Sequence, residues 1–84
     1  MIVSCARLAG GVVANASDED VGHIERIMID VATGRVAYAV VAYGGVLGIG
    51  QRFYAVPWQD LTPDPERRRF VLERDPEKLR IVAA

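Results

Sequence analysis

Cysteine is almost absent from this sequence, since Cys5 is its only example in 84 residues. No intrachain disulfide can form, and the protein must be held together by packing alone. Such sparing use of cysteine is typical of a reducing compartment, so we expect a cytoplasmic protein. No hydrophobic run approaches the ~20 residues that a membrane-spanning helix needs, so we expect no membrane span.

A dominant charge of either sign is also lacking. Ten Lys and Arg residues stand against eleven Asp and Glu residues, and the formal net charge is -1. This balance argues against a dedicated nucleic-acid binder, which usually carries an evident basic excess. His23 is the only histidine, and no serine or second cysteine accompanies it as nucleophile. The sequence indicates no catalytic residue, no metal site and no cofactor, so we expect a protein that is not an enzyme.

What the sequence does contain is a series of short apolar segments separated by turns. At 84 residues it predicts a single domain over residues 1–84. The pattern favours an all-β fold, a small antiparallel β-barrel of five to six short strands with a short C-terminal helical turn. Uneven alternation in the second strand indicates a bulge near Arg26. We predict strands over 7–14, 23–30, 35–43, 51–56 and 69–73, turns over 15–20, 30–34, 58–61 and 62–66, and a short helix over 76–82.

The segment 35–43 is apolar on both faces of the predicted strand. A half-exposed antiparallel strand would be polar on one face, so a partner is expected to cover the second face. The following segment, 44–50, is rich in glycine yet apolar, which is unusual for a loop. The simplest partner is a second copy in a homodimer. The predicted interface consists of Ala37, Ala39, Val41, Tyr43, Val46, Leu47 and Ile49, and Val41→Asp or Leu47→Asp is predicted to give a soluble monomer.

Arg67, Arg68 and Arg69 form the one local basic cluster and indicate an alternative function. Arginine makes bidentate contacts with phosphate groups, so these residues are candidates for RNA contact. The opposing interpretation is a solvated turn whose charges are offset by Glu66 and Glu73. Two hypotheses therefore stand: a self-associating, non-enzymatic interaction or assembly module, and an RNA- or ribosome-associated binding module.

Several motifs together give the chain a family resemblance over nearly its whole length. They are VGHIE at 21–25, ID at 29–30, TGRVAY at 33–38, GGVLGIG at 44–50, and AVPW at 55–58 followed by Leu61. With these motifs the chain resembles the PRC-barrel domain family, whose module occurs in the photosynthetic reaction-centre H subunit and in the C-terminal half of a ribosome maturation factor. The resemblance implies a compact β-barrel that acts by binding other macromolecules rather than by turnover.

Overall fold

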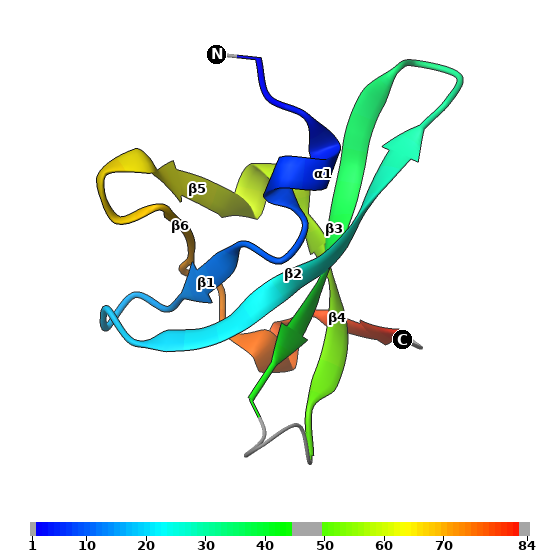
Figure 1. Ribbon diagram of the computed structural model, residues 1–84. Helices are drawn as coiled ribbons and strands as arrows, with labels where there is room; N and C mark the ends of the chain where they lie inside the picture. Colours follow the sequence, from blue (N-terminus) through cyan, green and yellow to red (C-terminus); the bar gives the residue numbers. More distant parts are fainter. Residues whose placement is uncertain (1, 45–49, 83–84) are drawn as a thin grey trace.

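The computed structural model describes residues 2–44 and 50–82 and is mostly β, as predicted (Figure 1). Its strands form one sheet in the order β5-β6-β1-β2-β3-β4-β7. No ladder joins β5 to β7 within the described ranges, so the sheet formed by these residues is not closed. The elements are α1 (Cys5–Leu8), β1 (Val12–Ala14), β2 (Asp20–Asp30), β3 (Arg35–Tyr43), β4 (Arg52–Pro57), η1 (Trp58–Asp60), β5 (Leu61–Asp64), η2 (Pro65–Arg67), β6 (Arg69–Leu72), η3 (Pro76–Lys78) and β7 (Arg80–Val82).

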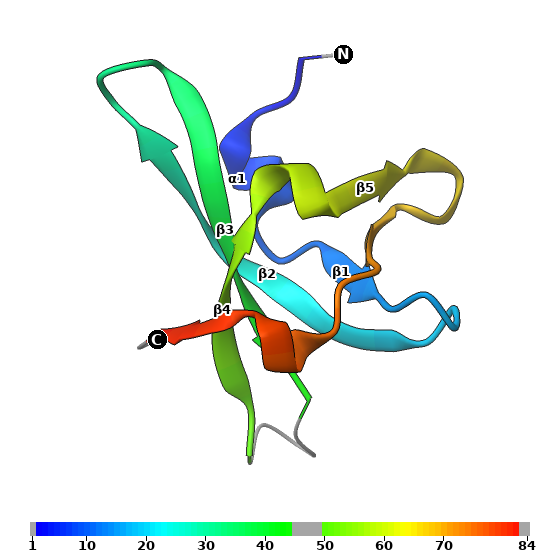
Figure 2. The same cartoon turned by 180° about the vertical axis from the view of Figure 1, so that it is seen from behind.

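The long β2–β3 hairpin dominates the fold, and its outer end projects beyond the rest of the molecule (Figures 1 and 2). The predicted turn at its tip is confirmed: Gly34 has φ +74° and its N–H donates to the Asp30 carbonyl at 2.8 Å. Glycine suits this left-handed position because it has no Cβ. The register of the pair shifts between Ile24 and Arg26, which confirms the predicted bulge.

The N-terminal segment differs from the prediction of a strand over 7–14. Residues Cys5–Leu8 form one helical turn, and the Ser4 side chain caps it by accepting from the Ala6 N–H at 3.2 Å. The chain then bends at Gly10, which has φ +83°, and β1 begins only at Val12. The apolar run of the sequence therefore divides between a capped turn and a short strand.

Two strands were not predicted. β5 contains Pro63, which the sequence indicates as a turn residue; proline is tolerated because β5 is the edge of the sheet, where no ladder partner needs its N–H. The predicted helix over 76–82 stops after the single turn η3, and Arg80–Val82 pairs with β4 instead. Residues 2–44 and 50–82 thus form seven strands, more than the predicted five to six, and the β1–β6 pair is parallel rather than antiparallel.

The core lies between the inward faces of the coiled sheet. Partly buried side chains pack against it, among them Trp58 and Phe70, whose ring centroids are 5.9 Å apart. None of the helices in residues 2–44 and 50–82 has the length and apolarity required to cross a membrane. The buried core cluster consists of Val13, Ile24, Ala39, Val41, Tyr54, Val56, Leu61, Leu72 and Leu79.

Candidate interaction surface

The predicted interface on β3 lies largely inside the protein. Ala39 and Val41 have 0% of their surface exposed and belong to the core cluster, while Tyr43 packs against that cluster and Ala37 is exposed. Val41 stands between its cross-strand partners Ile24 and Tyr54, which also point inward. The prediction that this face points outward is therefore wrong for Ala39 and Val41. The remaining predicted residues, Val46, Leu47 and Ile49, lie outside the described residues.

The opposite face of β3 is also covered within the chain. Val40 is 2% exposed and Ala42 is 0% exposed. Each has a larger cross-strand neighbour, Arg26 beside Val40 and Phe53 beside Ala42. A large side chain next to a small one leaves the small one little contact with water. The middle of β3 is thus buried on both faces without a partner.

Exposed apolar side chains gather instead at the outer end of the β2–β3 hairpin, residues 27–36, which we call the hairpin arm. Met28 is 36% exposed, Ile29 48% and Val31 91%. β1 pairs with β2 only over Asp20–His23, so the outer edge of β2 over residues 27–30 has no ladder partner within the described residues. The arm therefore presents both apolar side chains and an open strand edge. Val31, a large apolar residue within the turn 30–34, was the sequence signal for it.

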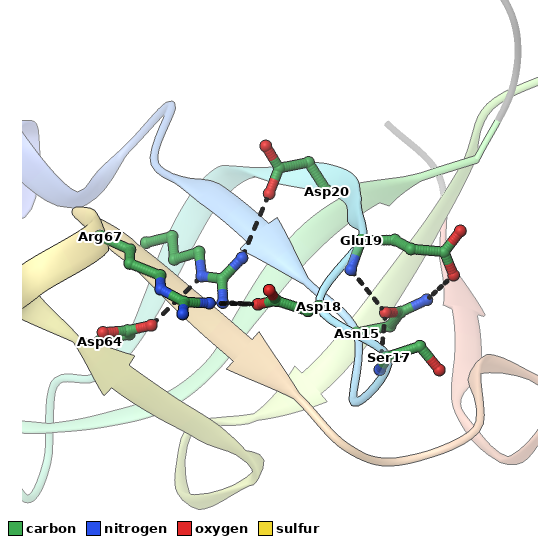
Figure 3. A network of polar contacts seen from close by, with 8 residues as sticks. Asn15, Ser17, Asp18, Glu19, Asp20, Asp64 and Arg67 are labelled. Atoms are coloured by element: carbon green, nitrogen blue, oxygen red, sulfur yellow. Dashed lines mark hydrogen bonds and ion pairs between the residues drawn. The ribbon is translucent and has the colours of Figure 1, made fainter.

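The three arginines of the RNA alternative have different surroundings. Arg67 and Arg69 both contact the Asp18 carboxylate, Arg67 at 2.5 Å (Figure 3). Arg68 is exposed in a left-handed conformation with φ +54°. The side chain of Arg69 is only 10% exposed and also lies 3.3 Å from Asp64. Two of the three guanidinium groups are thus bound to carboxylates of the same chain, so the cluster is mainly a tie between two segments.

Asp18 is the centre of this tie and is held in place by the loop before it. Asn15 Oδ1 accepts the backbone N–H of Ser17 at 2.9 Å and that of Glu19 at 3.0 Å (Figure 3). Asp18 itself has φ +69°. The hydrogen bond from Arg69, with a further one from Arg67, lowers the pKa of the Asp18 carboxyl below its ordinary value of 3.8. The loop before β2 is therefore fastened to β6 through a carboxylate that is ionised at neutral pH.

We expect Asp18→Asn to remove the acid-sensitive part of this tie. Because the pKa of Asp18 is lower in the folded state, its stabilisation is complete above about pH 3.8 and is lost as the pH falls through the folded-state pKa. The variant should therefore be less stable than the wild type at pH 7 and equal to it at the acid end. Asparagine tolerates the left-handed conformation, so backbone strain adds little. Urea unfolding between pH 2 and 7 measures the difference.

Glu66→Gln is the matched control for this experiment. Glu66 is an exposed acid in the neighbouring η2 and forms no ion pair within the described residues. Its replacement removes the same charge without breaking the tie. If the control lost as much stability at pH 7 as Asp18→Asn, net charge rather than the Asp18 contacts would be the cause.

Other polar groups form smaller arrangements. His23 Nε2 lies 2.9 Å from Glu25 Oε2, and both side chains are partly exposed. Over residues 2–44 and 50–82, no three His, Cys, Asp or Glu side chains gather into a possible metal site. His23 and Glu25 make a surface pair on the bulged part of β2.

The comparisons with known proteins identify one family. The sequence model of the PRC-barrel domain matches residues 2–79, which is most of the 84-residue chain. No curated protein matches the sequence.

Proposed function

Because this chain belongs to the PRC-barrel domain family, we propose that it is a non-enzymatic interaction module that self-associates as a homodimer. The observation that carries the proposal is the hairpin arm, where Met28, Ile29 and Val31 are exposed beside an open edge of β2. Exposed apolar side chains that gather in one place usually mark a contact surface. The alternative RNA function is not favoured, since Arg67 and Arg69 are occupied by carboxylates of the chain itself.

A second copy is the partner that this surface fits best. An open strand edge pairs readily with another strand, and the same edge of β2 from two copies can meet antiparallel around a two-fold axis. The net charge of -1 leaves little repulsion between copies. Burying a fully exposed apolar side chain contributes roughly 1.5–3 kcal/mol, and the exposed parts of Met28, Ile29 and Val31 in two copies amount to about three to four such side chains. Their sum, roughly 5–10 kcal/mol, is of the same order as the cost of association, about 4–15 kcal/mol. We therefore expect a dimer whose population depends on concentration.

The test is the absolute mass by light scattering during size-exclusion chromatography, over a range of protein concentrations. The wild type should approach twice the 9.2 kDa of one chain as concentration rises. The double variant Ile29→Asp/Val31→Asp should remain monomeric, because charges on the arm of both copies repel and resist desolvation. A wild type that is monomeric at every concentration would disprove self-association.

Ile81→Asp is the matched control. Ile81 is 56% exposed on β7, far along the sheet order from β2. It should dimerise like the wild type. If it became monomeric while the arm variant still dimerised, the contact would lie on the β7 side of the sheet and the role of the hairpin arm would be wrong.

A further inference from the structure

A hollow of about 300 Å³ is lined by residues of β3, of β4 and of the segment 74–80. This segment leads into β7, which pairs with β4 (Figure 2). Tyr38 and Pro57 are cross-strand partners that line it, and so are Ala55 and Arg80. Partners directly opposite each other point to the same side of a sheet. These two pairs point away from the core face, because Ala55 precedes the core residue Val56 and side chains alternate along a strand, whereas Leu79 of the core cluster also lines the hollow. The hollow is thus open to the outside.

The rim of the hollow is basic. Arg74, Lys78 and Arg80 line it, and Lys78 and Arg80 are exposed without an ion pair among the described residues. Arg74 Nε lies 3.1 Å from Asp60 Oδ2, yet that buried oxygen has no aligned hydrogen bond. Arg74 is therefore paired with Asp60, and Lys78 and Arg80 are the cations of the rim that have no ion pair among the described residues. The side chains that line the hollow include three cations and no carboxylate, while the acids of the same segment, Glu73, Asp75 and Glu77, lie outside the lining. We call this hollow, with its three cations, the basic pocket.

The floor of the basic pocket is apolar. Ala55 and Leu79 are each 9% exposed, and Pro57 completes the wall. The short side chain of Ala55 leaves the space that a larger residue would fill. A ligand suited to this site carries a negative group for the rim and an adjoining apolar group for the floor.

We propose that the basic pocket binds an acidic segment of a partner protein, with an Asp or Glu carboxylate at the cationic rim and a neighbouring apolar side chain on the floor. The planar guanidinium of arginine matches a carboxylate in a two-pronged hydrogen bond. Nucleic acid fits less well, because Tyr38 is the single aromatic side chain among the described residues lining the pocket and gives no platform for successive bases. The inference does not rest on self-association.

The experiment measures fluorescence anisotropy of a labelled peptide with alternating Glu and Leu, six residues long, titrated with the full chain. Binding is expected to weaken as salt is added, because the rim is exposed and screened. Lys78→Ala/Arg80→Ala should weaken it by about tenfold or more, because the double change removes both unpaired cations of the rim and their charge-assisted hydrogen bonds. Arg35→Ala/Arg52→Ala removes the same charge from exposed sites outside the pocket and should bind like the wild type.

Three controls make the result decisive. The same peptide with Gln in place of Glu should bind at least about tenfold more weakly, because it lacks the carboxylates. If Arg35→Ala/Arg52→Ala weakened peptide binding as much as Lys78→Ala/Arg80→Ala, the effect would come from overall charge, and the proposed site would be wrong. Tighter binding of inorganic phosphate or of an octauridylate RNA than of the acidic peptide would overturn the choice of ligand. Light scattering on the same samples measures self-association independently of peptide binding. Each of the two proposals can therefore fail without affecting the test of the other.

Discussion

Val41→Asp is expected to unfold the protein rather than to release a soluble monomer. Val41 is 0% exposed within the core cluster, so the new carboxylate would be buried without a partner. We expect a loss of about 4 kcal/mol or more, the range found when a charge is buried unpaired. The total stability expected for a domain of this length is roughly 4–13 kcal/mol. Circular dichroism and urea unfolding at neutral pH measure the effect.

Val31→Asp makes the same chemical change at a site that is 91% exposed. It should alter the free energy of unfolding by no more than about 0.5 kcal/mol, as is usual for surface substitutions. A Val41→Asp variant that unfolds with wild-type cooperativity and midpoint would mean that this face of β3 points outward after all. The pair of variants therefore separates burial from the mere introduction of a charge.

Gly22→Ala is the second change for which we expect a large effect. A Cβ added at Gly22 would lie 2.0 Å from the carbonyl oxygen of Ala42, and that atom belongs to the backbone of the neighbouring strand. Neither side can yield by a side-chain rotation, so β2 and β3 must separate where Gly22 pairs with Tyr43. We expect a loss of about 3 kcal/mol or more, at or above the upper end of typical overpacking effects.

Gly34→Ala is the matched control, because it adds the same methyl group in open space. No heavy atom lies within 4 Å of that Cβ, but φ is +74°. The left-handed conformation costs a residue with a Cβ about 1–2 kcal/mol. Urea unfolding of both variants should rank Gly22→Ala as the less stable. The reverse order would show that backbone strain at the turn outweighs the contact between the strands.

Local chemistry made part of the fold predictable. β3 has the predicted bounds Arg35–Tyr43, and the turn before it ends at Gly34 as expected. These features depend on the conformational freedom of glycine and on β-branched residues in series, which act over a few neighbouring residues. The bulge before Arg26 was also visible, because it breaks the alternation of apolar residues.

Which face of β3 is inside was not decided by the sequence, since both faces are apolar and a one-residue change of register exchanges them. The bulge after Ile24 and the pairing with β4 fix that register. Pro63 is likewise compatible with a strand because β5 lies at the edge of the sheet. Residues 80–82 pair with β4 as a strand and do not continue the predicted helix.

The candidate sites, too, depend partly on local sequence and partly on contacts between distant segments. The sequence by itself determined a mostly β fold, a near-neutral charge and the family, because composition, turn residues and short motifs are local properties. Only the tertiary structure decided that Arg67 and Arg69 face Asp18, some fifty positions earlier, and that Arg74, Lys78 and Arg80 surround an open hollow. These groups meet through strand order and register. Those are set by the packing of distant segments, which no local pattern of residues specifies.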